Sequence, residues 1–206
     1  MRSLFILLLT SGAALAQPVS FGLKAGLPLT DLVSTAQGDT TAATRRYLVG
    51  PEVEVRLPLG LSVEFDALYR HFNYANYEAL AGTTLTTVGS SGNWEFPLVA
   101  KYRFTGKLVR PYVEAGAAWD VPSGSKNAST ATPCSIGVCE GANYPPTPSS
   151  QRTAGVVLGG GVDLHWKVLH IAPEIRFTRW SQQYFDLSGY LHSGRNQVEF
   201  LVGFTH

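Results

Sequence analysis

Acidic and basic side chains recur at every second position in several stretches of the chain, so candidate chemistry collects on one face. In LSVEFDALYR (61–70), the charged residues Glu64, Asp66 and Arg70 share one face, and mainly apolar residues occupy the other. Carboxylates beside cations suit proton transfer, ion conduction or ion-paired packing. Alternation with a period of two predicts a β-strand. Which chemistry is performed therefore depends on the architecture that presents this face.

Histidine supplies the other candidate chemistry. A hydrolase needs a nucleophile that contacts a histidine, with a carboxylate nearby. His192 and Ser193 are the best match, but adjacency in sequence does not bring two side chains into contact, so we assign no catalytic residue. His165 and His170 flank a tight turn; two such histidines can bind a metal, but we expect them to cap one end of a lumen. We assign no metal site and no cofactor.

The first residues have the pattern of a secretory signal peptide. Arg2 precedes an apolar run, and Ala14-Leu15-Ala16 forms a small-residue cleavage site. The apolar run is too short to span a bilayer, which argues against a membrane anchor. We expect residues 1–16 to be removed after Ala16 and residues 17–206 to form one domain. No later run is long enough for a transmembrane helix.

The only two cysteines, Cys134 and Cys139, lie in the polar stretch PCSIGVCEG. In an exported chain, such a close pair predicts a local disulfide. A metal site is the weaker alternative because no histidine lies nearby. The net charge of +1, with no basic run, gives no indication of nucleic-acid binding.

Eight alternating segments follow the signal peptide. They span residues 19–29, 47–57, 59–70, 94–104, 109–119, 156–166, 169–177 and 198–204. One parity of each segment carries no charge. The other parity carries ten acids, namely Glu52, Glu54, Glu64, Asp66, Glu95, Glu114, Asp120, Asp163, Glu174 and Glu199. It also carries eight bases, namely Lys24, Arg46, Arg56, Arg70, Lys101, Arg103, Arg110 and Arg176.

Two architectures produce such alternation: a soluble barrel or sandwich, and a transmembrane barrel. Most of the segments are about 11 residues long, which matches a tilted crossing of a bilayer. The apolar face also ends in aromatic residues at both rims, as in outer-membrane barrels. The two predicted girdles are Tyr47, Tyr69, Trp94 and Trp119 at one rim, and Tyr102, Phe104, Trp166 and Phe204 at the other. These features favour the transmembrane barrel.

Short and long connections alternate along the chain. Long polar connections are predicted at 30–46, 70–93, 120–155 and 178–197. The sequence therefore predicts an all-β fold, an eight-stranded antiparallel up-and-down transmembrane β-barrel with long extracellular loops and short periplasmic turns. Prolines inside the segments remove ladder donors, and we expect bulges or distorted pairing there. They are Pro51, Pro97, Pro111 and Pro173.

The mature chain resembles the small eight-stranded bacterial outer-membrane barrels of the OmpA/OmpX type. PEIRFTRW (173–180) followed by NQVEFLVGFTH (196–206) is similar to the terminal hairpin of outer-membrane barrel-domain proteins. Such proteins usually end in an aromatic residue read during assembly, whereas Thr205 and His206 follow Phe204 here. The resemblance implies a bacterial outer-membrane location, contact with outer-membrane lipid and lipopolysaccharide, and handling by the export and barrel-assembly machineries.

An eight-stranded barrel is just wide enough for side chains to fill its lumen. We therefore expect the inward charges to form an ion-paired network whose main role is structural. Its predicted members are Glu52, Glu54, Arg56, Glu64, Asp66, Arg70, Lys101, Arg103, Glu114 and Arg176. The favoured function is structural or surface-interacting, through loop display, adhesion or envelope integrity, toward an external ligand that the sequence does not identify. A narrow ion or small-solute channel and a lipid-modifying enzyme are the alternatives.

Overall fold

The computed structural model describes residues 19–30, 33–35, 40–80, 83–132, 149–150, 152–166, 169–182, 185–187 and 191–205. The predicted signal peptide and the predicted Cys134–Cys139 disulfide lie outside these residues. Among the described residues, no helix has the length and apolar character needed to span a membrane.

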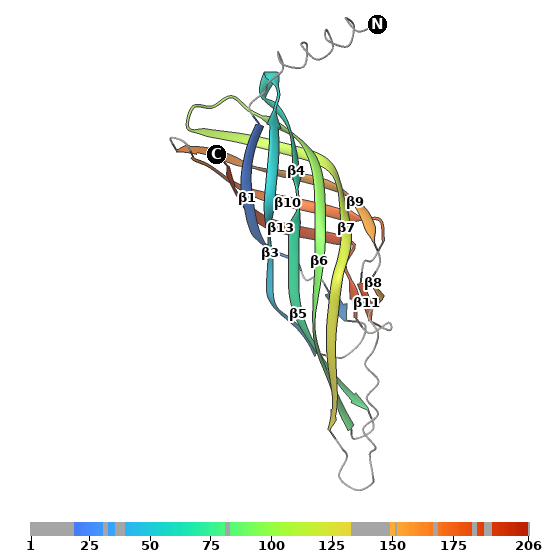
Figure 1. Ribbon diagram of the computed structural model, residues 1–206. Coiled ribbons are helices and arrows are strands. Elements are labelled where there is room, and N and C mark those ends of the chain that lie inside the picture. The colour runs from blue at the N-terminus through green and yellow to red at the C-terminus, as the bar shows by residue number, and fades with distance from the viewer. Residues whose placement is uncertain are drawn as a thin grey trace, which may run out of the picture.

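The main sheet is a closed antiparallel barrel (Figure 1). Its strands are β1 (Val19–Pro28), β3 (Thr40–Arg56), β4 (Leu61–Asp66), β5 (Leu68–Leu80), β6 (Thr83–Arg103), β7 (Val109–Thr132), β9 (Thr153–Trp166), β10 (Leu169–Trp180) and β13 (Asn196–Thr205). The barrel closes because β1 pairs with both β3 and β13. β4 and β5 follow one another along the same two neighbours, so they occupy one position and the barrel has eight strands. The predicted fold class is confirmed.

The short connections between strands lie at one end of the barrel, together with the start of the first strand and the end of the last strand. The 3-10 turn η1 (Pro58–Gly60) joins β3 to β4, and residues 104–108 join β6 to β7. β1 begins and β13 ends at this same end (Figure 1). We call it the turn end, and the opposite end the loop end.

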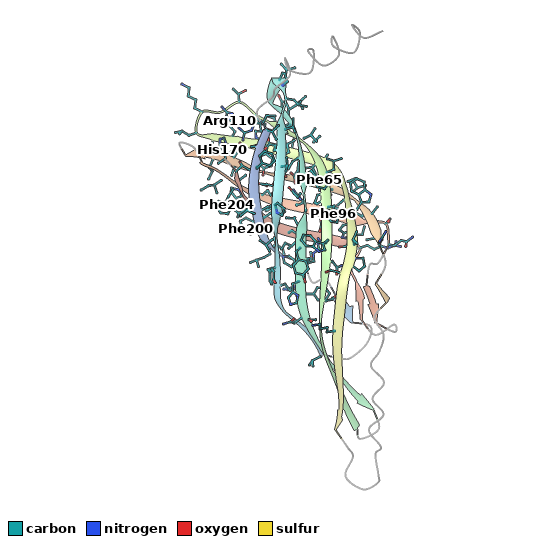
Figure 2. All side chains as sticks on the ribbon, in the orientation of Figure 1. Phe65, Phe96, Arg110, His170, Phe200 and Phe204 are labelled. Atoms are coloured by element: carbon teal, nitrogen blue, oxygen red, sulfur yellow. The ribbon has the colours of Figure 1, made fainter. Side chains whose placement is uncertain are left out.

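The burial pattern is the reverse of that in a soluble barrel, because apolar side chains are exposed and charged side chains are buried. β4 alternates strictly, with Leu61, Val63 and Phe65 exposed and Glu64 and Asp66 at most 2% exposed. On other strands, Phe21 is 65% exposed and Ile175 is 55% exposed. The apolar parity therefore faces outward, and the charged parity fills the lumen. Figure 2 shows Phe65, Phe96, Phe200 and Phe204 on the barrel wall.

Two of the four prolines at which distorted pairing is predicted explain why one barrel position is divided between β4 and β5. Ala67, which separates the two strands, donates its backbone N–H to the carbonyl of Pro51 on β3. On the other side, pairing with β6 stops at Phe65–Leu98 and resumes at Leu68–Glu95, so it skips Pro97. Because proline has no N–H, the ladder is interrupted on both sides of Ala67.

The other two prolines follow the same rule, because each is paired on one side only. Pro173 pairs with Val202 on β13 but is left out of the β9–β10 register. Pro111 pairs with Val162 on β9, whereas the β6–β7 register ends at Arg103–Tyr112, one position short of it.

The strands continue well past the predicted segments at the loop end. β5 and β6 remain paired from Leu68–Glu95 to Leu80–Thr83, and β6 and β7 remain paired as far as Thr84–Thr132. The bounds predicted for the long loop at 70–93 are therefore wrong, because most of this loop is a β-hairpin. Its alternating Thr, Ser and Gly residues lack the apolar parity on which the prediction depended.

Short segments of the other predicted loops form a second sheet. It has four strands in the order β2 (Val33–Thr35), β12 (Leu191–Ser193), β11 (Phe185–Leu187) and β8 (Ser149–Ser150). Its strands come from three predicted loops that are far apart in sequence. The connections at the loop end are therefore partly ordered by pairing with one another.

Candidate functional site

The lumen carries the candidate functional site, an ion-pair network arranged in three clusters. Each of the ten charged residues predicted for the lumen makes at least one ion pair there. Strand β6 sets the order of the clusters, because Arg103, Lys101 and Glu95 follow one another from the turn end toward the loop end.

The central cluster surrounds two lysines and one arginine. Its members are Lys24, Glu52, Glu64, Asp66, Lys101, Glu114, Glu174 and Arg176. The Lys24 ammonium lies 2.5 Å from Glu64 and 3.2 Å from Glu174. Lys101 bridges the same two carboxylates at 2.6 Å and 3.1 Å. Arg176 contacts Glu174 at 2.8 Å, so this carboxylate is shared by all three cations.

Tyr112 completes the central cluster with a neutral donor. Its hydroxyl donates a 2.6 Å hydrogen bond to Glu174, and the Lys101 ammonium lies 4.6 Å from the centre of its ring. Buried charges are costly unless they are paired and hydrogen-bonded. Glu174 meets both conditions.

The loop-end cluster consists of Arg70 with the carboxylates Glu95, Asp120 and Glu199, all of them 0% exposed. Arg70 forms a close ion pair with Glu95 and lies 2.8 Å from Glu199 and 3.9 Å from Asp120. One oxygen of each carboxylate has no hydrogen-bond partner among the described residues. This cluster contains three acidic groups and one basic group.

Amide and indole groups adjoin the loop-end cluster. Asn93 donates a 2.9 Å hydrogen bond to Asp120, and Gln197 donates one to Glu199. Gln197 in turn accepts a 3.1 Å hydrogen bond from the indole of Trp180, which is 1% exposed. These bulky and polar groups are buried, so they fill part of the lumen near its loop end.

The turn-end cluster consists of Glu54, Arg56, Arg103, Asp163 and His170. Both oxygens of Glu54 accept from Arg103, at 2.5 Å and 2.7 Å, and Asp163 accepts from it at 3.0 Å. Arg56 lies 3.6 Å from Glu54, and the His170 ring nitrogen lies 3.3 Å from Asp163. Planar bidentate pairing fixes the orientation of a guanidinium, so Arg103 is held rigidly.

Glycines on the lumen side make room for these long side chains. A Cβ atom at Gly159 would lie 2.5 Å from a Glu114 oxygen, and one at Gly161 would lie 2.7 Å from the Tyr112 hydroxyl. Gly159 and Gly161 therefore leave room for these side chains within the barrel.

The near balance of ten acids and eight bases does not describe the buried lumen. All ten acids are buried, whereas the buried bases among the described residues are Lys24, Arg70, Lys101 and Arg176. Arg46, inside β3, and Arg110, at the start of β7, are only partly buried. The sequence count is therefore wrong for the buried region, because parity places a residue on a face but not at a height along the barrel.

The predicted aromatic residues lie on the outside near the two rims. At the loop end, Tyr69 and Trp94 are register partners whose ring centres are 5.3 Å apart. Tyr47 is 41% exposed and Trp119 is 45% exposed. At the turn end, Tyr102, Phe104 and Phe204 are each 43–47% exposed. The side chain of Trp166 lies outside the described part of the chain.

Several members of the network were absent from the predicted set. The charged ones are Lys24, Glu95, Asp120, Asp163, Glu174, Glu199 and His170, and the neutral ones are Asn93, Tyr112, Trp180 and Gln197. Parity had placed the six Lys, Asp and Glu residues, and His170, on the charged face. Trp180 continues that parity two positions beyond Thr178, so extending the seventh segment by three residues would have revealed it.

The geometry of the lumen is that of packing and charge compensation. Lys24, Arg70, Lys101 and Arg176 are each at most 2% exposed, so solvent does not reach them. Among the described residues, two sets of buried carboxylates lie close enough together to bind a metal ion, and Glu64 belongs to both sets. The ammonium groups of Lys24 and Lys101 already form ion pairs with Glu64. His192 and Ser193 lie on β12 with their backbones paired to β2, and their side chains are outside the described residues.

No protein-family model matches the chain, and no curated protein matches its sequence. Among solved structures, the N-terminal β-barrel domain of Pseudomonas aeruginosa OprF has 13% identity and a TM-score of 0.45, over 92% of this chain and 98% of that one. P. aeruginosa OprG has 13% identity and a TM-score of 0.49, over 91% and 92%. Neisserial surface protein A has 14% identity and a TM-score of 0.41, over 90% and 94%. The fold assignment depends on the strand pairing described above and not on these likenesses.

Proposed function

We propose that this chain is an integral protein of the bacterial outer membrane whose barrel anchors a β-structured surface for contact with external partners. The observation that carries the proposal is the inverted barrel, which has an apolar wall, a charged lumen and strands that continue beyond the apolar wall at the loop end. In water, an apolar surface of this size would drive association or aggregation. In a bilayer, the same surface is favourable.

The strand extensions supply the surface for partners. Beyond Trp94 and Trp119, β6 and β7 read TTLTTVGSSG (83–92) and SGSKNASTAT (123–132). These hydroxyl-rich residues suit contact with water and with polar partners rather than lipid. Their backbone pairing holds them as a stiff platform.

The proposal includes the processing and location that the sequence predicts. Export would remove residues 1–16 after Ala16, and an oxidising compartment would allow Cys134 and Cys139 to form a disulfide. The loop end would then face outside, toward lipopolysaccharide, and the turn end would face the periplasm. The proposal assigns no catalytic role to the chain.

Site-specific labelling of intact bacteria tests this topology. In a Cys134→Ser, Cys139→Ser background, Lys126→Cys places a single thiol on the β7 extension, and Lys107→Cys places one on the β6–β7 turn. Both lysines are exposed. A maleimide polymer too large for porins should label the Lys126→Cys variant on intact cells. It should label the Lys107→Cys variant only after the envelope is opened.

Heat-modifiable migration on gels serves as the control for correct folding of both variants. Equal labelling of the two thiols on intact cells would contradict the proposed topology. Recovery of a monomer that stays in solution without detergent would contradict the membrane location itself.

A further inference from the structure

A cavity of about 480 Å³ opens at the turn end, between the β3–β4 turn and the β6–β7 turn. Its lining combines two kinds of side chain. Arg56, Arg103 and Arg110 form the cationic part, and Leu57, Leu61 and Tyr102 belong to the apolar part. We call it the turn-end cavity. An amphiphilic lining of this kind suits a ligand with both a charged and an apolar portion.

The cationic part is not fully neutralised by its neighbours. Arg103 is held by Glu54 and Asp163. Arg56 lies 3.6 Å from Glu54 through Nε and 3.4 Å from Nδ1 of His170 through Nη2, and its side chain is 29% exposed. Arg110 donates through Nε to the carbonyl of Gly106 at 2.8 Å, which orients its guanidinium against the turn. Arg56 and Arg110 therefore remain able to bind an anion, in a protein whose lumen is otherwise rich in acids.

The apolar part continues the lipid-facing wall. Leu61 and Tyr102 are register partners on β4 and β6, and they are 43% and 44% exposed. Leu59 is 87% exposed and has a left-handed φ of 65°, which is unusual for a residue with a side chain. The turn thus holds a leucine outward beside the cavity.

The position of the cavity indicates what kind of molecule meets it. Figure 2 places Arg110 and His170 near the turn end. Tyr102 and Phe104 lie at this level, and aromatic residues at a barrel rim mark the boundary between acyl chains and headgroups. Guanidinium groups at that boundary lie at the height of lipid phosphates. Arginine binds phosphate through paired hydrogen bonds.

We propose that the turn-end cavity binds an anionic phospholipid of the leaflet that faces the turns. Arg56 and Arg110 hold its phosphate, and Leu57, Leu61 and Tyr102 contact the first part of its acyl chains. Leu59 inserts beside the lipid and limits exchange. The inference rests on the membrane location proposed above, which the labelling experiment tests independently.

Calorimetric titration of the folded full-length protein in a non-ionic detergent tests the site. The probe is dihexanoylphosphatidylglycerol, with dihexanoylphosphatidylcholine and inorganic phosphate as comparison ligands. The parent should bind the glycerol lipid at least about tenfold more tightly than either comparison ligand, because only that lipid combines a net negative headgroup with acyl chains. Arg56→Gln with Arg110→Gln should weaken this binding by about tenfold or more.

A charge-matched control removes two cations from elsewhere on the surface. Arg179→Gln with Lys126→Gln lowers the net charge equally at exposed positions away from the turn end, and it should bind the glycerol lipid as the parent does. Arg110→Gln alone covers the case in which the double variant fails to fold, because Arg110 donates to a backbone carbonyl oxygen.

Three results would overturn the inference. The first is equal affinity of the parent for phosphatidylcholine. The second is unchanged binding in the arginine variants. The third is equally tight binding of inorganic phosphate, which would make the cavity a site for the free anion.

Discussion

Lys24 is the residue on which the central cluster depends most. Its ammonium lies within 3.3 Å of Glu52, Glu64, Asp66 and Glu174, and it is 1% exposed. Removing one partner of a buried ion pair is more damaging than never having had the pair, because the remaining charge stays buried. Four carboxylates would lose a cation together here.

We therefore expect Lys24→Met to lower the free energy of unfolding by about 3–5 kcal/mol. Urea titration of the protein in lipid vesicles, followed by tryptophan fluorescence, measures the change. The control is Lys107→Met on an exposed turn, which should change stability by about 0.5 kcal/mol or less. Equal stability of the two variants would show that the central cluster contributes little to folding.

Parity along the sequence predicted which side chains face the lumen but not which of them meet. Lys24 and Glu174 are 150 residues apart, and their contact depends on how far each strand is shifted along the barrel. No residue type encodes that shift. For the same reason, the sequence did not reveal that Arg70 is shared by three acids.

Strand β6 passes through three different environments along its length. Its turn end lies in the aromatic rim, its middle lies on the apolar wall, and its first ten residues form the polar extension. Leu98 is 43% exposed on the wall, and Val88 is 46% exposed on the extension. The two side chains are about equally exposed. If the barrel lies in a membrane, Leu98 faces lipid and Val88 faces water.

Arginine at these two positions should therefore have different effects. Leu98→Arg should destabilise the folded protein in vesicles by about 2–4 kcal/mol, as expected for a charge on the lipid face near the bilayer midplane. Val88→Arg should cost about 0–1 kcal/mol, because its surroundings are aqueous. Urea unfolding in vesicles compares the two directly. Similar losses at both positions would contradict the assigned membrane boundary.

The elements were predictable wherever one face of a strand is apolar. The segment 61–70 predicted both its strand and its outward face, because apolar and charged residues alternate strictly there. Residues 83–93 gave no such signal, since neither face of a polar hairpin needs burial. The interruption at Ala67 also needed the pairing of three strands, because Pro51 and Pro97 act from its neighbours.

Two properties of the lumen affect ion conduction in opposite ways. Buried side chains that fill it oppose the passage of ions, whereas its excess of acids favours the entry of cations. Trp180, Gln197 and Arg70 fill the lumen near the loop end, with exposures of 0–1%. The three carboxylates around Arg70 would nonetheless attract cations if water entered. A lumen of this kind should be closed at rest and cation-selective when opened.

Planar-bilayer recordings provide the measurement. We expect the parent protein to show no sustained conductance, because its buried ion pairs exclude water. Arg70→Ser leaves Glu95, Asp120 and Glu199 without their shared cation, and their mutual repulsion favours hydration of the loop end. This variant should open more often and should select cations over anions. Arg179→Ser, at an exposed position, should behave as the parent does. Sustained conductance in the parent, unchanged by Arg70→Ser, would instead make the protein a channel at rest and would contradict the closed lumen.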